Sequence, residues 1–117
     1  TTSSVWVVNH GDVETTSFDP SDAGLAPADP AELRGADAAY NAKVARALLA
    51  GERGPVRDTV LLNAAAGLVA FAGPEATTLV AQLRAAMERC AAAIDDGSAA
   101  AKLDMWVSAS RSARESS

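Results

Sequence analysis

Few side chains in this 117-residue sequence have the type and spacing that catalysis needs. The single histidine, His10, lies in the predicted turn Asn9–Asp12, so we interpret it as solvated, without a second ligand or an orienting partner. The single cysteine, Cys90, falls on the apolar stripe of a predicted helix, where cysteine is mostly an inert small hydrophobe. Neither residue predicts a nucleophile or a metal ligand.

Two acidic positions could bind a ligand, but each has a structural alternative. Asp95 and Asp96 could attract a cation, yet directly before Gly97 they are equally typical of a solvated helix end. Asp37 stands at a predicted helix start, where anions can bind, but its carboxylate would repel a phosphate, so capping is the better interpretation. With no nucleophile–base pair, glycine-rich phosphate loop or metal-spaced cluster, we predict no catalytic residue and no metal ligand here.

A long apolar helix at 55–72 is the element around which we expect the chain to fold. Gly54-Pro55 and Gly73-Pro74 delimit it, since proline suits the first helical position and glycine suits the residue after the last. A helix that is apolar all round is buried or crosses a membrane, and this run is shorter than the roughly 20 residues of a span. We therefore predict a buried central helix, with Gly67 allowing a neighbouring backbone to approach.

Asn63 is the only polar side chain between Val60 and Ala72. A buried amide almost always needs a hydrogen-bond partner. We therefore expect Asn63 to bond a neighbouring chain end, in preference to a ligand.

The first 18 residues predict a β-hairpin. Val5 and Val7 alternate with Trp6 and Val8, so the first strand is apolar on both faces, as in sheets covered on both sides. An isolated hairpin is marginally stable, so this one is expected to belong to the edge of a larger sheet whose other strands lie outside the chain. Residues 19–36 form a turn-rich connector, and 37–113 hold the helices. The predicted fold is thus an α/β fragment: a hairpin and about four α-helices packed around the central helix.

The composition indicates which class of partner and which cell compartment to expect. The net charge of −5, with acidic and basic residues mixed along the helices, leaves no basic stripe for a nucleic acid. A lone cysteine without a recognisable secretory signal is typical of a reducing cytoplasm. Because the sequence opens at Thr1 without an initiator methionine, we expect it to be an excised piece.

Three segments in the same order and spacing resemble the C-terminal part of the anthranilate phosphoribosyltransferases. They are Leu33–Ala42, Gly54–Ala65 and Ala93–Leu103, and the Val-Trp strand with Phe18-Asp19-Pro20 and Gly24-Leu25 also fits. The sequence departs from the family where Ala36 replaces a second glycine and Tyr40 replaces a glutamate. Without that glutamate, Asp37 cannot form a reciprocal capping box.

The resemblance implies that the parent enzyme transfers phosphoribose from phosphoribosyl pyrophosphate to anthranilate, with Mg²⁺, in tryptophan biosynthesis. It further implies a cytoplasmic homodimer. In this family a glycine-rich loop holds the pyrophosphate and an Asp-Glu pair helps to hold the metal. The loop has no counterpart here, the acid pair would fall immediately before Thr1, and the anthranilate-binding residues belong upstream. Thr1 and Thr2 are therefore the residues nearest the family site, and the chain alone is expected to be inactive and to bind no Mg²⁺.

A second interpretation stays open at this point. The chain could be a non-catalytic helical interaction module whose exposed hairpin edge recruits a partner strand. In the first interpretation its partner is the missing N-terminal portion of the same enzyme. In neither is a nucleic acid or a membrane a partner.

Overall fold

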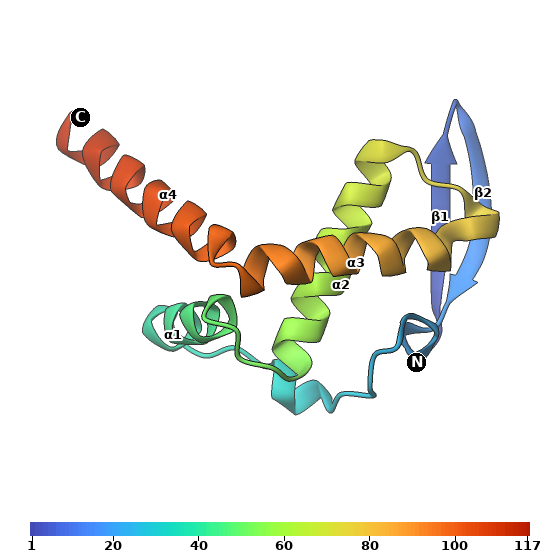
Figure 1. Ribbon diagram of the computed structural model, residues 1–117, viewed down its shortest axis with the longest axis horizontal. Coiled ribbons are helices and arrows are strands. Elements are labelled where there is room, and N and C mark those ends of the chain that lie inside the picture. Colours follow the sequence, from blue (N-terminus) through green and yellow to red (C-terminus); the bar gives the residue numbers. More distant parts are fainter. The chain divides into compact units, whose positions relative to one another are not determined.

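The structure, a computed structural model, describes residues 1–117. In chain order it contains β1 (Ser3–Asn9), β2 (Asp12–Phe18), α1 (Ala38–Leu49), α2 (Pro55–Ala72), α3 (Leu79–Asp95) and α4 (Ser98–Glu115), with short 3₁₀ helices η1 (Pro20–Ala23), η2 (Pro30–Leu33) and η3 (Ala76–Thr78) (Figure 1). One antiparallel hairpin and four α-helices confirm the predicted α/β composition. The chain divides into two compact units, 1–34 with 53–90, and 35–52 with 91–117.

The hairpin opens the first unit. Its two strands pair from Ser3 opposite Phe18 to Asn9 opposite Asp12. His10 and Gly11 form the turn with φ values of 50° and 82°, both positive, as a type I′ turn requires. The predicted turn is confirmed, and His10 is exposed within it.

Two side-chain amides fasten the loop between α2 and α3 in the first unit. Asn9 Nδ2 of β1 donates to the carbonyl oxygen of Pro74 at 3.1 Å. Gln82 Nε2 of α3 donates to the carbonyl oxygen of Gly73 at 3.0 Å, and Gln82 Oε1 accepts from the backbone N–H of Glu75 at 2.9 Å. The loop is therefore held to both the hairpin tip and α3.

The prediction that α2 is buried all round is wrong for this chain. Its bounds are the predicted ones, but only a stripe at four-residue spacing is buried, consisting of Arg57, Leu61, Ala65 and Val69. Phe71 is 93% exposed, and a Cβ added at Gly67 would meet no atom within 4 Å. The apolar pattern of α2 predicted contacts on every face of the helix. In the structure, the other residues of the chain bury only one of its faces.

By length and composition α2 could also cross a membrane, with 22% of its residues buried. The core helix of a soluble protein passes the same test. The expectation that no membrane is involved therefore stays a prediction.

The connector at 19–36 is more regular than its proline content predicted. Both 3₁₀ helices begin at an Asp-Pro pair, Asp19-Pro20 and Asp29-Pro30. Asp29 and Glu32 form a reciprocal capping box, with side-chain to backbone distances of 2.9 Å in each direction. Proline at the first position of a short helix is favourable because its missing N–H would be unpaired there.

The second unit contains α1, the end of α3 and α4. Asp37 begins α1 as predicted, since its Oδ1 accepts from the Tyr40 N–H at 2.8 Å. Arg46 of α1 and Asp104 of α4 form an exposed ion pair at 3.3 Å. Leu48 and Ile94 are the buried hydrophobic residues of this unit.

Candidate functional site

A cavity of about 260 Å³ lies at the N-terminal end of β1, beside Thr1. It is bounded by the beginning of the chain, the connector around η1 and the first turns of α2. Polar side chains in its lining are those of Thr1, Asp19, Ser21, Asp58 and Thr59. Leu25, Leu33 and Leu62 are among its apolar residues. The structure thus brings the predicted Thr1 together with four polar residues that the sequence did not single out as site residues.

Local hydrogen bonds hold the carboxylate of Asp19 in place. Its Oδ1 accepts from the Ser21 backbone N–H at 2.9 Å and from the Ser21 hydroxyl at 2.7 Å. Its Oδ2 accepts from the Thr2 hydroxyl at 3.4 Å, which ties the beginning of β1 to η1. Asp19 is therefore the N-cap of η1 and the polar partner of Thr2 at once.

These bonds keep Asp19 ionised. The Ser21 hydroxyl, and after it the Ser21 backbone N–H, lowers the pKa of Asp19 from its ordinary value, because both donate to the charged form. Such a carboxylate has no proton to give at neutral pH. It can accept hydrogen bonds and orient Thr2, but it is unsuited to general acid catalysis.

The side chains that line this cavity can position a bound molecule by hydrogen bonding. The hydroxyls of Thr1 and Thr59 can donate or accept, and the carboxylates of Asp19 and Asp58 can accept. No group of three or more His, Cys, Asp or Glu side chains is placed where it could hold a metal ion. The residues of this chain do not by themselves fit a Mg²⁺ site, and we assign no step through the metal to them.

Asp95 and Asp96, the pair considered above for a cation, lie where α3 ends. Asp96 Oδ1 accepts from the Ser98 backbone N–H at 2.8 Å where α4 begins, and hydrogen bonding by Ser98 lowers the pKa of Asp96. This agrees with the structural alternative for Asp95-Asp96. The Ser98 hydroxyl instead donates to the Ala93 carbonyl oxygen, at 3.0 Å.

The expectation for Asn63 is wrong. Its side chain is exposed, and Nδ2 donates to the carbonyl oxygen of Thr59 at 2.8 Å within the same helix. An exposed amide one turn after a carbonyl can satisfy itself locally, so no neighbouring chain end is needed. Cys90, which was placed on the apolar stripe of its predicted helix, is only partly buried.

Sequence reasoning missed Asp19, Asp58 and Thr59 as residues of one site. Asp19 carried a signal, because Asp-Pro-Ser is a favourable start for a short helix. Asp58 and Thr59 carried none. They stand in the first turn of α2, and only the tertiary structure places that turn beside Thr1.

Comparison with known proteins covers most of the chain. Residues 1–100 match the family described as "Glycosyl transferase family, a/b domain". An anthranilate phosphoribosyltransferase of Acidothermus cellulolyticus is 64% identical over 114 residues, which is 97% of this chain and 32% of that protein. Proteins with the same name from Streptomyces avermitilis and Frankia alni are 61% and 51% identical, over 93% and 97% of this chain. The chain spans about a third of the length of these curated relatives.

Proposed function

The chain belongs to the glycosyl transferase family, with the a/b domain over residues 1–100, and from this premise we propose that it is the C-terminal third of an anthranilate phosphoribosyltransferase. The observation that carries the proposal is the 64% identity to the Acidothermus cellulolyticus protein over 97% of the chain. The ordered positions of the three matching segments support the C-terminal placement.

In the proposed reaction the amine nitrogen of anthranilate forms a bond to the ribose carbon that carries the pyrophosphate. The bond from that carbon to the pyrophosphate oxygen breaks, the pyrophosphate leaves with the electron pair, and the amine loses a proton. Such a transfer depends on positioning and on neutralising the leaving group. This chain offers Thr1, Thr2 and Asp19 as part of the wall, and the convergent donors belong to the remaining polypeptide.

The cofactor, assembly and compartment belong to the same proposal. The intact enzyme would use Mg²⁺ held by residues outside this chain, and it would be a homodimer in the cytoplasm. The family resemblance supports the use of Mg²⁺, the homodimer and the cytoplasmic location. The chain alone would then be inactive and would bind neither Mg²⁺ nor phosphoribosyl pyrophosphate specifically.

A chimaera tests the proposal. This chain replaces the matched third of the Acidothermus cellulolyticus protein, and the loss of anthranilate fluorescence is followed with phosphoribosyl pyrophosphate and Mg²⁺. We expect turnover by the chimaera and none by the 117-residue chain. The unmodified relative is the positive control. A folded chimaera without turnover would contradict the proposal, and it would favour the non-catalytic interaction module.

A further inference from the structure

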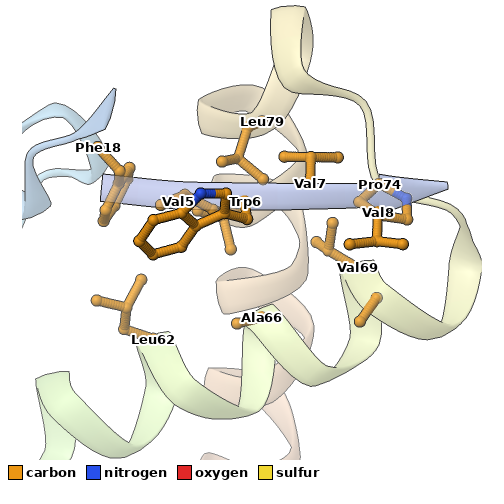
Figure 2. A pocket seen from close by; sticks show the side chains of 12 residues that line it. Val5, Trp6, Val7, Val8, Phe18, Leu62, Ala66, Val69, Pro74 and Leu79 are labelled. Carbon is orange, nitrogen blue, oxygen red and sulfur yellow. The ribbon is translucent and has the colours of Figure 1, made fainter. Parts of the chain in front are cut away.

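The strand pairing of the hairpin ends one residue short of Thr2. Ser3 opposite Phe18 is the pair at that end, so Thr1 and Thr2 lie outside the ladder. Phe18 is only 6% exposed and lines an apolar cavity of about 360 Å³, where Figure 2 shows it near the Val5 end of β1. The end of β2 is therefore fixed by burial, whereas Thr1 and Thr2 need another support.

Asp19 supplies the support that the ladder no longer gives. It directly follows Phe18, and its Oδ2 accepts from the Thr2 hydroxyl at 3.4 Å. The other carboxylate oxygen, Oδ1, is held by the Ser21 backbone N–H at 2.9 Å and by the Ser21 hydroxyl at 2.7 Å. Since Ser21 belongs to η1, the position of Thr2 depends on the position of η1.

Arg84 of α3 holds η1 from the other side. Its Nε donates to the backbone carbonyl oxygen of Asp22 in η1 at 2.8 Å, although the two residues are 62 positions apart in the sequence. A helix of one turn is unstable by itself, so η1 depends on such a tertiary contact. Arg84 is not among the residues that line the cavity beside Thr1. It therefore reaches that cavity only through η1, Asp19 and Thr2.

We propose that Arg84 and Asp19 are positioning residues for phosphoribosyl transfer, with Arg84 holding η1 to α3 and Asp19 holding Thr2 to η1. This inference rests on the proposed function. A transfer between two bound substrates depends on their orientation, and a misplacement of about 1 Å by a distant substitution can cost about 100-fold in rate. Without the support from η1, the wall at Thr1 and Thr2 has no fixed position.

Kinetics of Arg84→Ala in the chimaera described above provide the first test. We expect kcat to fall by about tenfold, because the wall loses its fixed position. The KM values for anthranilate and phosphoribosyl pyrophosphate should stay close to those of the unmodified chimaera, since Arg84 contacts neither the cavity nor a substrate in it. Arg89→Ala is the matched control. Arg89 is the same residue type, exposed on the same helix, and forms no hydrogen bond to η1, so this variant should keep full activity.

Two substitutions of Asp19 separate positioning from a direct effect of its charge. Asparagine retains an oxygen that can accept from Ser21 and an amide that can donate to the Thr2 hydroxyl, whereas alanine retains neither. We expect Asp19→Ala to lower kcat by about tenfold and Asp19→Asn to restore most of the loss. If Asp19→Asn is as slow as Asp19→Ala, the charge itself acts on the substrates, and the positioning role is wrong.

Hydrogen exchange measures the link between α3 and η1 without reference to activity. The N–H groups of Asp22, Gly24 and Leu25 donate to backbone carbonyl oxygens within the η1 turn. In Arg84→Ala we expect the segment 20–25 of the chimaera to exchange about tenfold faster, as loss of one hydrogen bond from a charged group implies. In Arg89→Ala the exchange of this segment should be unchanged. Equal exchange in the two variants overturns the proposal.

The outcomes distinguish this inference from the proposed function. An active chimaera whose kcat is the same in Arg84→Ala and Arg89→Ala leaves the enzyme assignment intact and overturns the positioning role. An unmodified chimaera that folds but shows no turnover contradicts the assignment, and with it the role of both residues in the reaction. A melting temperature for each variant shows that it is folded. If Asp19→Ala does not fold, Asp19→Asn and the two arginine variants still decide the question.

Discussion

Asp19 shows how a single residue combines a structural and a site role. Its carboxylate caps η1, bonds Thr2 and lines the cavity beside Thr1. Because its pKa is lower in the folded chain than in the unfolded one, folding favours the ionised form. The associated stability is present above the ordinary pKa of 3.8 and is lost as the pH falls through the lower, folded value.

The Ser21 hydroxyl is the largest cause of that shift, so its removal is the direct test. We expect Ser21→Ala to raise the pKa of Asp19 toward 3.8, because the variant loses the hydrogen bond from the Ser21 hydroxyl to the carboxylate. The Ser21 backbone N–H and the Thr2 hydroxyl would still donate to it. NMR titration of the side-chain carboxyl carbon measures it. Ser17→Ala, at an exposed position of β2, is the control and should leave the pKa of Asp19 unchanged. An unchanged value in Ser21→Ala would contradict this account of Asp19.

At the scale of elements, α2 is the helix whose sequence and structure differ most. Its apolar residues surround the axis, but its buried residues form one stripe. A substitution in the stripe should therefore differ sharply from one outside it. We expect Leu61→Ala, at a position only 7% exposed, to lower the free energy of unfolding by about 2–5 kcal/mol.

The comparison is Phe71→Ala, which removes a larger side chain from a position that is 93% exposed. It should change the free energy of unfolding by no more than about 0.5 kcal/mol, as surface substitutions usually do. Urea denaturation of both variants provides the measurement. If Phe71→Ala costs as much as Leu61→Ala, the exposed face of α2 is packed in solution.

Gly67 provides a second test of the same helix. Sequence reasoning expected a close backbone approach there, so that a side chain would overpack. In the structure an added Cβ has open space around it. We therefore expect Gly67→Ala to stabilise the chain by about 0.4–1 kcal/mol, because alanine restricts the unfolded state and favours the helix. Destabilisation measured by the same urea titration would restore the original expectation.

For the whole molecule, exposed apolar side chains favour self-association, whereas the net charge opposes it. Trp6, Val8, Phe71 and Trp106 are each more than 60% exposed. At pH 7 the net charge of −5 keeps copies apart, and this repulsion vanishes near the isoelectric point of 4.7. We expect self-association to increase as the pH falls from 7 toward 4.7.

Light scattering at fixed protein concentration and several pH values measures this association. Added salt at pH 7 should act in the same direction, because it screens the charges. A Trp6→Thr variant should associate less at pH 4.7, since it removes apolar surface beside the free edge of β1. A chain that stays monomeric at pH 4.7 would contradict this expectation.

Much of the architecture was predictable from sequence because its causes are local. The turn at His10-Gly11, the ends of α2 at Pro55 and Gly73, and the cap at Asp37 each depend on neighbours within about four residues. Backbone geometry and short-range hydrogen bonds decide such features. The family resemblance depends on three segments and their order, so it was also available from the sequence. The family match over residues 1–100 and the 64% identity to a protein of that name confirm it.

Tertiary structure decided what depends on residues distant in the chain. Only it placed Asp58 and Thr59 of α2 beside Thr1, and only it showed which stripe of α2 is buried. The apolar residues of α2 surround its axis, whereas the buried ones are Arg57, Leu61, Ala65 and Val69 on one stripe. Hydrophobic stabilisation requires a second surface, so the pattern of one helix predicts that its faces can be covered, while the packed structure determines which of them are.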